Sequence, residues 1–423
     1  MDKVVTLTDA SARTPTARSA RRRAGARRRR SKTALVLGGG GLTGGVYEIG
    51  ALRALDLLSV HRTVNEFDVY VGTSAGSFVA AAIANGVTPG EMMRAIVRDG
   101  PSRFPDVRAG ALLHPNYREF IARGAKLPFR LAGLAFELAR EIGQVSAVDV
   151  VLGLAEALPT GLYTGDGLER YVREILSDPA RTDDFRELGS ELYIVATDLD
   201  TCERAVFGAE GLDGVPISRA VSASSALPMI YKPVEIDGHE YVDGGLVSTT
   251  NLDVAVEAGA KFIVVVNPLV PYVNEAGAAD ADAGAVGRPR VSSMGFPRIG
   301  YQAFKLLAHQ RLHELARRWE QRYPGVDIIL IEPEPSDELM FRTNVMNFTS
   351  RVDIARHGFE SVTLHLSHEY HRYKEICARH GIEISATRVQ SVVRHLDDSP
   401  ASTRAWRRIL GQTTSTLLRQ SAS

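Results

Sequence analysis

The stretch FDVYVGTSAGSFVAAAIANG, residues 67–86, carries the strongest signal for the fold of this chain. FDVYV (67–71) is rich in β-favouring residues and predicts a strand, and SAGSFVAAAIANG (74–86) predicts a helix of small residues. The same order occurs before it, where TALVLG (33–38) predicts a strand and VYEIGALRALDLL (46–58) a helix. Successive strand–helix units indicate an α/β fold, in which helices cover the faces of a parallel sheet.

The rest of the chain predicts further strands, one hairpin and more helices. ELYIVATDLD, KFIVVVNP and DIILIEPEP are apolar, β-branched runs of strand length. In YKPVEIDGHEYVDGG (231–245), the pair Asp237–Gly238 lies between two β-rich runs and is a strong hairpin signal. The remaining predictions are a loop over 272–300, which is rich in Gly, Ala, Asp and Pro, and helices over about 301–320 and 349–380.

The formal net charge of zero hides an uneven distribution. Residues 1–32 hold 11 Lys and Arg against two Asp, a net charge of +9, and the other 391 residues carry −9. This Arg-rich tail has few apolar residues to bury, so we expect it to be disordered. It lacks the apolar region of a secretory signal and is compatible with a transit peptide or a contact with anionic membrane lipids. Nothing outside the tail supports nucleic-acid binding.

Membrane spans and disulfides are not predicted. No apolar run approaches the ~18 residues of a membrane-spanning helix, and FIVVVNPLV (262–270) is short and β-branched, as in a buried strand. The chain has two cysteines, Cys202 and Cys377, which suits a reducing compartment. These features predict a cytoplasmic protein, with peripheral membrane contact left open.

The GTSAG segment places Ser74 where a predicted strand turns at once into a predicted helix. Such a corner strains the backbone of its middle residue and leaves room only for very small neighbours, here Gly72 and Gly76. The serine oxygen is then exposed at the carboxyl end of the strand, beside the partial positive charge of the helix N-terminus. A G-x-S-x-G segment in this context indicates a reactive serine.

A reactive serine needs a base, and the 11 histidines offer no clear candidate. His239 lies in the predicted hairpin. Two pairs share helix faces, His309 with His313 and His365 with His368, and such spacing is compatible with a metal. Both helices are otherwise ordinary and no H-E-x-x-H motif occurs, so we predict no metal site.

Asp243 is a better candidate base. It ends a β-rich run and precedes Gly244 and Gly245, at a position where active sites of open α/β sheets lie. A carboxylate acts as a general base when its surroundings raise its pKa. An Asp-Gly turn of purely structural value is the alternative.

The glycine run GGGGLTGG, residues 38–45, has two interpretations. Gly39, Gly41 and Gly44 match G-x-G-x-x-G, which cradles a pyrophosphate when an acidic residue ends the next strand. That strand ends in GTSAG instead, and no P-loop lysine is present. The other interpretation is an oxyanion hole made by the backbone amides of the loop.

Together these segments resemble the patatin-like phospholipase family. GGGGLTGG, GTSAG and DGG occur in the family order, and the stretches LVLGGGGLTGGVYEIGALRAL and RAVSASSALPMIYKPVEIDGHEYVDGG are also similar to it. The resemblance covers roughly residues 33–270. It implies a Rossmann-like three-layer α/β/α sandwich with a mostly parallel central sheet, to which we add a helical C-terminal extension.

The resemblance also implies a Ser–Asp dyad without a catalytic histidine or a cofactor. Ser74 would be the nucleophile and Asp243 the base. The oxyanion hole would be Gly39, Gly40 and Gly41, in which Gly40 and Gly41 donate and Gly39 shapes the loop. The motif-supporting residues would be Gly44, Gly72, Gly76, Gly244 and Gly245.

The implied activity is hydrolysis of carboxylic esters of phospholipids or other lipids through an acyl-enzyme. One position departs from the family: Thr43 stands where its loop usually carries arginine. Arginine there could assist a phosphate headgroup, so its absence favours a neutral ester. The alternatives are a neutral-lipid or short-chain carboxylesterase, and a nucleotide-binding protein that uses the glycine loop.

The predicted domain organisation has four parts. They are a disordered Arg-rich tail (1–32), a patatin-like catalytic domain (33–270), a C-terminal continuation with a loop, helices and one further strand (271–385), and a polar helical or disordered tail (386–423). Within the second part, KLPFRLAGLAFELAREI (126–142) predicts an amphipathic helix that lies in the core, covers an acyl-chain pocket or contacts a membrane. Oligomeric state is not indicated by the sequence.

Overall fold

The computed structural model describes residues 31–97, 112–125, 159–273, 291–335, 337, 339–340, 349–388 and 390. Nearly all of the Arg-rich tail, the segment 126–142 and most of 386–423 lie outside these residues, so the predictions made for them are untested. The chain divides into two compact units, residues 1–31 and 32–423, and every element below belongs to the second unit.

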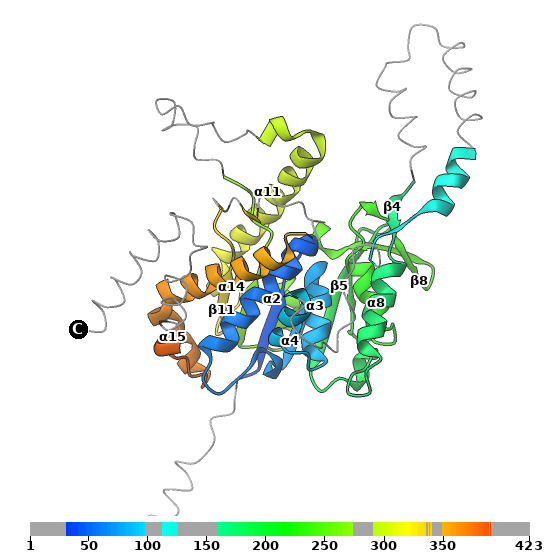
Figure 1. Cartoon of the computed structure of the whole chain (residues 1–423). Helices are drawn as coiled ribbons and strands as arrows, with labels where there is room; N and C mark the ends of the chain where they lie inside the picture. The colour runs from blue at the N-terminus through cyan, green and yellow to red at the C-terminus, as the bar shows by residue number, and fades with distance from the viewer. Residues whose placement is uncertain are drawn as a thin grey trace, which may run out of the picture. The chain divides into compact units, whose positions relative to one another are not determined.

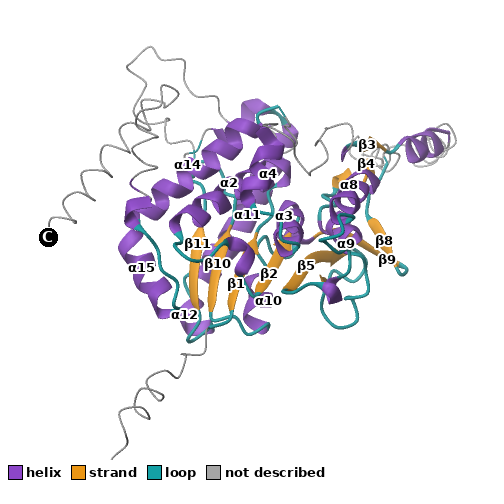
Figure 2. Ribbon diagram, turned by 60° about the horizontal axis from the view of Figure 1, so that its bottom comes forward, coloured by secondary structure: helices purple, strands orange, loops and turns teal. Residues whose placement is uncertain are grey.

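Within the described residues, eight strands form one sheet in the order β11-β10-β1-β2-β5-β9-β8, with β6 also paired to β5 (Figure 2). From β11 to β5 all neighbours are parallel, and β9, β8 and β6 are antiparallel additions. The strands are β1 (Thr33–Leu37), β2 (Val69–Thr73), β5 (Glu191–Asp198), β6 (Arg204–Phe207), β8 (Val234–Ile236), β9 (His239–Asp243), β10 (Phe262–Val266) and β11 (Asp327–Ile331).

Helices cover both faces of this sheet (Figure 1). On β1, Leu35 and Leu37 face one side and Ala34 and Val36 the other, and all four are fully buried. Such apolar runs are typical of parallel strands buried on both faces. The first face packs against α2 (Gly41–Leu58), α3 (Ala75–Ala84), α4 (Pro89–Val97), α8 (Asp166–Leu176), α9 (Ile217–Ser224), α14 (Arg351–His368) and α15 (Tyr370–Arg379); the second packs against α10 (Leu252–Glu257), α11 (Phe296–Ala316) and α12 (Trp319–Arg322).

The predicted hairpin is present as β8 and β9, which pair antiparallel. Asp237 and Gly238 form its turn with φ of 52° and 86°, the left-handed values that a two-residue hairpin turn requires. The helix predicted from about residue 301 begins earlier, at Phe296, so the predicted loop over 272–300 is too long at its C-terminal end. A second, small sheet contains β3 (His114–Pro115), β4 (Gly161–Thr164) and β7 (Met229–Tyr231).

The C-terminal helix α14 crosses α2 at very close range. A Cβ atom at Gly50 of α2 would lie 2.2 Å from the carbonyl oxygen of Ala355, and one at Gly358 of α14 would lie 2.4 Å from that of Tyr47. The two backbones therefore touch where both helices have glycine. As a result, the helical C-terminal part shares one core with the first half of the chain.

These features confirm the predicted fold class, a mixed α/β fold with a central, mostly parallel sheet, flanking helices and a helical C-terminal part. A search of the described helices for one that is both long enough and apolar enough to cross a bilayer found none.

Candidate active site

Ser74 lies alone between β2 and α3, at the corner that the sequence predicts. Its φ and ψ are 55° and −127°, a conformation rare for a residue with a side chain. A Cβ atom at Gly72 would lie 2.5 Å from the Cα of Ser77, and one at Gly76 would lie 2.5 Å from the Leu37 carbonyl oxygen. Positions 72 and 76 of the corner are therefore closed to any side chain.

Hydrogen bonds on both sides hold the strained backbone of Ser74. Its amide donates to the Oγ of Ser224 at 2.9 Å, and that hydroxyl donates in turn to the carbonyl oxygen of Val195 at 2.6 Å. Its own carbonyl oxygen accepts from the amide and hydroxyl of Ser77, at 2.9 and 2.5 Å, and from Ser225 Oγ at 3.1 Å. A strained conformation persists when its surroundings fix it in this way.

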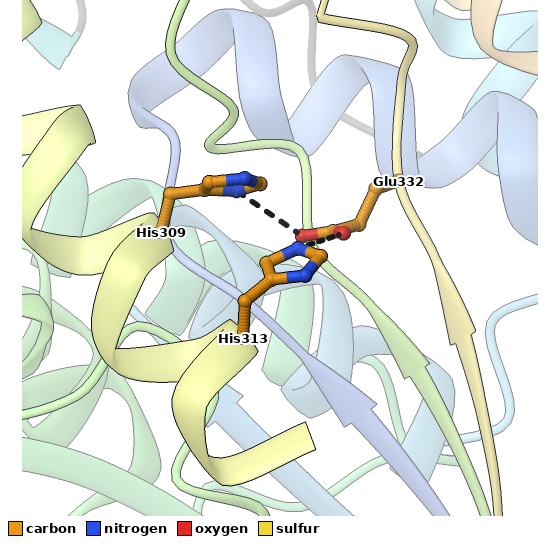
Figure 3. A group of neighbouring side chains, drawn as sticks. All are labelled: His309, His313 and Glu332. Carbon is orange, nitrogen blue, oxygen red and sulfur yellow. Dashed lines mark hydrogen bonds and ion pairs between the residues drawn. The ribbon is translucent and has the colours of Figure 1, made fainter. Parts of the chain in front are cut away.

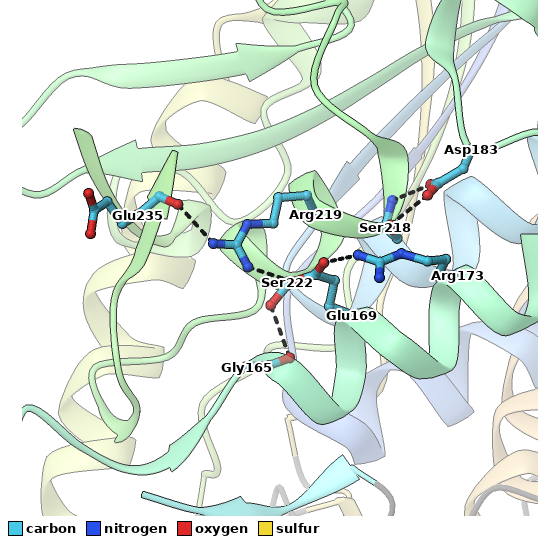
Figure 4. Close-up of polar contacts among 8 residues, drawn as sticks. All are labelled: Gly165, Glu169, Arg173, Asp183, Ser218, Arg219, Ser222 and Glu235. Carbon is cyan, nitrogen blue, oxygen red and sulfur yellow. Dashed lines mark hydrogen bonds and ion pairs between the residues drawn. The ribbon is translucent and has the colours of Figure 1, made fainter. Parts of the chain in front are cut away.

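Ser224 belongs to α9, and a polar network fixes that helix to its neighbours (Figure 4). Arg219 bonds to Glu169 of α8 at 2.5 Å and to the carbonyl oxygen of Glu235 at 2.9 Å. Ser222 Oγ donates to the Gly165 carbonyl oxygen at 3.1 Å. At the start of the helix, the amide and hydroxyl of Ser218 both bond to the Asp183 carboxylate. These contacts position α9, and with it the hydroxyl that holds Ser74.

The Asp243 carboxylate lies directly beside Ser74. Its Oδ2 accepts a hydrogen bond from Ser74 Oγ at 2.5 Å, and its Oδ1 accepts from the amide of Gly245 at 2.8 Å. Both side chains are buried, with 6% of Ser74 and 3% of Asp243 exposed. Burial raises the pKa of Asp243 to about 6, against the lowering effect of the two hydrogen bonds. At neutral pH the carboxylate is ionised and basic enough to accept a proton.

Asp243 is the last residue of β9, and the pairing register of that strand brings it to this position. β9 runs antiparallel to β5 and pairs Asp243 with Ala196, one residue beyond the pairing of Val195 with Thr73. The Asp243 amide donates to the carbonyl oxygen of Ala226 at 3.0 Å. A Cβ at the next residue, Gly244, would lie 2.2 Å from the Val195 carbonyl oxygen. The backbone after Asp243 therefore packs against β5 so closely that only glycine fits.

The glycine loop connects β1 to α2 and lies against the same serine. The amide of Gly39 donates to the Thr249 carbonyl oxygen at 3.0 Å, so this residue holds the loop and its amide is engaged. No group in the described part of the chain accepts a hydrogen bond from the amide of Gly40 or Gly41. A Cβ at Gly39 would lie 3.4 Å from the Ser74 Cβ, so this part of the loop lies against the serine.

The other face of the loop is filled by Pro268. A Cβ at Gly40 or Gly44 would lie 2.9 or 3.0 Å from the proline Cγ. This packing leaves little room there for the pyrophosphate of a bound dinucleotide. Thr43, which stands at the family's arginine position, is buried, and its hydroxyl lies 3.4 Å from the carbonyl oxygen of Gly40.

Two cavities meet at Ser74. One, of about 20 Å³, is lined by Asp243, the glycine loop, Tyr301 and Phe304, and it has the size of a single water site. The other, of about 150 Å³, is almost entirely apolar, and its lining includes Leu42, Phe78, Leu113, Tyr171, Leu227 and Tyr231. Ser74 therefore lies between a small cavity that the Asp243 carboxylate also lines and a larger, apolar one.

The histidines considered as bases or metal ligands lie elsewhere. His239 bonds to Asp198 at 2.8 Å, and His365 bonds to the Tyr373 hydroxyl at 2.7 Å. His309 and His313 lie together on α11, beside Glu332. In the part of the chain that the structure describes, none of these four bonds to Ser74 or Asp243.

Sequence reasoning missed the serines that hold Ser74. Ser224 and Ser225 occur in RAVSASSALP, a stretch that stands out in the sequence only as part of the family resemblance. Their value depends on how α9 packs against β5 and α3, which no local pattern encodes. The run of three serines in four residues was the only available signal.

Comparison with known proteins identifies a family for this chain. The sequence profile of the patatin-like phospholipase family matches residues 35–256, which is 222 of the 423 residues. The chain is 22% identical over 223 residues to the "Probable lipid hydrolase 463L" of Invertebrate iridescent virus 6, covering 53% of this chain and 63% of that protein. It is 25% identical over 234 residues to human "Patatin-like phospholipase domain-containing protein 6", covering 55% of this chain and 13% of that protein.

Among solved structures, VipD from Legionella pneumophila aligns with 91% of this chain and 83% of its own, at 12% identity and a TM-score of 0.32. The chain spans less than two thirds of the length of the curated relatives it matches. The profile match alone extends over more than half of the sequence and includes the glycine loop, GTSAG and DGG. The chain belongs to the patatin-like phospholipase family.

Proposed function

We propose that this chain hydrolyses carboxylic esters of lipids through a dyad of Ser74 and Asp243 and an acyl-enzyme intermediate. The observation that carries the proposal is the 2.5 Å hydrogen bond from Ser74 Oγ to Asp243 Oδ2, made at a strained and closed corner. A serine hydroxyl becomes a nucleophile when an adjacent base takes its proton. The buried carboxylate, with a pKa of about 6, is such a base at neutral pH.

In the first half of the reaction, Ser74 Oγ attacks the ester carbonyl carbon and its proton passes to Asp243 Oδ2. The carbonyl oxygen becomes negatively charged and accepts hydrogen bonds from the amides of Gly40 and Gly41, which have no acceptor among the described residues. The tetrahedral intermediate then breaks its bond to the alcohol oxygen. That oxygen takes the proton from Asp243, and the alcohol leaves.

In the second half, a water molecule replaces the alcohol. It gives a proton to Asp243, attacks the acyl carbon and releases Ser74 Oγ, which takes the proton back. The cavity of about 20 Å³ next to the dyad has room for one such water. This sequence balances protons without a histidine, since Asp243 accepts and returns one proton in each half.

The apolar cavity beside Ser74 supports an acyl chain as the group that is transferred. Its volume of about 150 Å³ lies below the ~300–1,000 Å³ of pockets that enclose drug-sized ligands. This size, together with Thr43 in place of the family arginine, favours the second candidate, a neutral-lipid or short-chain carboxylesterase, over a phospholipase.

A fluorophosphonate probe, which reacts with activated serines, tests the dyad. We expect labelling of the wild-type protein, none of Ser74→Ala, and very weak labelling of Asp243→Asn. Ser177→Ala is the matched control, because this exposed serine lies at the end of α8 and should leave labelling unchanged. Labelling of Ser74→Ala at wild-type strength would refute the assignment.

A panel of esters then separates the two substrate classes. Phospholipids, lysophospholipids, triacylglycerols and p-nitrophenyl esters of increasing chain length are compared by kcat/KM. The cavity predicts a maximum at short to medium acyl chains. A clear preference for long-chain phospholipids would favour the phospholipase over the carboxylesterase and leave the dyad assignment intact.

A further inference from the structure

A cluster of three metal-ligating side chains lies apart from the dyad, on α11 and at the end of β11 (Figure 3). His309 and His313 are one turn apart on α11, with ring centroids 4.0 Å from each other. Glu332 is the residue that follows β11, and Figure 3 shows its carboxylate beside the two imidazoles. One ligand atom from each residue lies within 4.8 Å of the other two.

Hydrogen bonding explains only part of this cluster. Nε2 of His313 lies 2.8 Å from Oε2 of Glu332, which is a normal hydrogen bond. Nδ1 of His309 lies 4.0 Å from Oε1 of Glu332, which is too long for one. That nitrogen is buried and has no hydrogen-bond partner in the described part of the chain. A buried polar atom without a partner requires an explanation, such as an ion.

The distance between His309 and Glu332 fits an ion better than it fits a hydrogen bond. Zinc binds imidazole nitrogen and carboxylate oxygen at about 2.0–2.2 Å, so two of its ligand atoms lie at most about 4.3 Å apart. The 4.0 Å between Nδ1 of His309 and Oε1 of Glu332 is inside this limit. A contraction of about half an ångström reaches the ~3.4 Å separation of a tetrahedral site.

A second residue, Asn267, orients the carboxylate of Glu332. Its Oε1 accepts a hydrogen bond at 2.7 Å from Nδ2 of Asn267, a fully buried residue that follows β10. Such outer contacts fix the direction of a ligand in metal sites. The side chains of His309 and His313 are 24% and 41% exposed, which leaves a path for an ion from solvent.

We propose that His309, His313 and Glu332 bind one divalent transition-metal ion, with Zn²⁺ best matched to the two imidazoles and one carboxylate. Three protein ligands leave a fourth position for water. The ion would tie α11 to the end of β11. Because Tyr301 and Phe304 of α11 line the small cavity beside Ser74, this tie would also hold one wall of the candidate active site.

The proposal goes beyond ester hydrolysis and does not depend on it. Neither Ser74 nor Asp243 belongs to the cluster, so no step of the proposed reaction passes through the ion. The sequence alone predicted no metal at the two histidines, because their helix is otherwise ordinary and no H-E-x-x-H motif occurs. Glu332 lies 19 residues beyond His313, and no sequence pattern links it to them.

Metal binding to the purified full chain tests the proposal. The protein is stripped with a chelator, in the Cys202→Ser background because Cys202 is an exposed thiol, and then titrated with ZnCl₂ in a calorimeter. We expect one Zn²⁺ per chain, and at least a tenfold weaker affinity in His309→Ala, His313→Ala and Glu332→Gln. Bound Co²⁺ should give the visible absorption of a four-coordinate site.

The matched control is the double variant His365→Ala, His368→Ala. These histidines also share a helix face, but the structure places no third ligand beside them within the described residues. The control should bind Zn²⁺ as tightly as the parent. Binding of less than one equivalent by the parent, or equal loss in the control, would overturn the proposal.

Thermal melting distinguishes a variant that has lost metal binding from one that has misfolded. Zn²⁺ should raise the Tm of the parent and leave that of His309→Ala unchanged, while the two metal-free proteins melt alike. The same Zn²⁺ titration of Ser74→Ala should match the parent, because that serine is not a ligand. Loss of hydrolysis with intact Zn²⁺ binding, or the reverse, therefore distinguishes failure of one proposal from failure of the other. An equal Zn²⁺-induced rise in Tm for His309→Ala would contradict the metal site.

Discussion

Two polar clusters lie at the same edge of the sheet and are built in opposite ways. Ser74 and Asp243 are 6% and 3% exposed, and the backbone beside them leaves no room for a side chain at Gly72, Gly76 or Gly244. The side chains of His313 and Glu332 are 41% and 14% exposed. Nδ1 of His309, beside them, has no hydrogen-bond partner among the described residues. The first cluster is therefore enclosed with its hydrogen bonds made, whereas the second is more open and only partly hydrogen-bonded. Substitutions in the first should have the larger consequences.

The largest expected effect is that of Asp243→Asn on turnover. The amide cannot accept the serine proton, so kcat/KM for a p-nitrophenyl ester should fall about 10⁴-fold, as when the acid of a serine triad is neutralised.

The same change, Asp243→Asn, should stabilise the fold at about pH 8. Burial raises the pKa of Asp243 from 3.8 to about 6, and removing that penalty is worth about 3 kcal/mol in urea unfolding.

Glu48→Gln is the matched control for this prediction. Glu48 is fully buried on α2, where burial raises its pKa well above the usual value and the backbone of Gly38 lowers it by a smaller amount. The control should also gain stability at alkaline pH and yet keep its activity. If Asp243→Asn kept near-normal turnover, the enclosed cluster would not be the reactive one, and the contrast between the two clusters would fail.

The pH dependence of activity should follow the Asp243 carboxylate. Only the ionised form accepts a proton, so kcat/KM should rise about tenfold per pH unit up to about pH 6 and level off above it. Stability has the opposite sign, because the folded-state pKa is raised. Relative to Asp243→Asn, the free energy of unfolding should fall as pH rises from about 4 to about 6. An activity profile that stays flat from about pH 5 to about pH 8 would contradict the assigned base.

Ser224→Ala tests whether the enclosure itself matters. The substitution removes the donor to the Val195 carbonyl oxygen and the acceptor for the Ser74 amide, which leaves that buried amide unpaired among the described residues. We expect a loss of about 1–3 kcal/mol in unfolding free energy and slower probe labelling of Ser74. Ser222→Ala, on the same helix, loses one bond to Gly165 and should be destabilised without slower labelling. Equal labelling rates in both variants would show that the bond to Ser224 is not needed.

The smallest expected effect on hydrolysis is that of His313→Gln in metal-free protein. His313 bonds to Glu332 and to neither member of the dyad, so kcat/KM should stay within about threefold of the parent, as for sites without shared partners. The measurement is the same ester assay, run with chelator present. A loss approaching that of Asp243→Asn would mean that the two clusters act as one site.

The sequence predicted the first cluster because its geometry is locally encoded. A strand that turns directly into a helix fixes the corner at Ser74, and the glycines on either side indicate that larger side chains do not fit there. The hairpin signal at Asp237–Gly238 positioned β9, and the resemblance supplied the role of Asp243. The sequence did not reveal that β9 is antiparallel to β5, which depends on pairing between distant strands.

The second cluster could not be predicted in the same way. The spacing of His309 and His313 was visible, but the third ligand comes from the end of a strand 19 residues on, and the orienting Asn267 from another. The extent of α11 was also misjudged, since its first turn follows a stretch rich in loop-forming residues. Contacts between elements that are distant in sequence decide each of these features, and a single sequence contains no signal for them.

The close contact of α2 with α14 at Gly50 and Gly358 sets a lower limit on the length of chain that can fold by itself. The family match ends at residue 256, whereas the apolar face of α2 is covered by a helix that begins at Arg351. A fragment trimmed to the matched region would uncover that face and lose the support behind the helix that starts at the glycine loop. The smallest autonomous unit of this protein is therefore longer than its family signature.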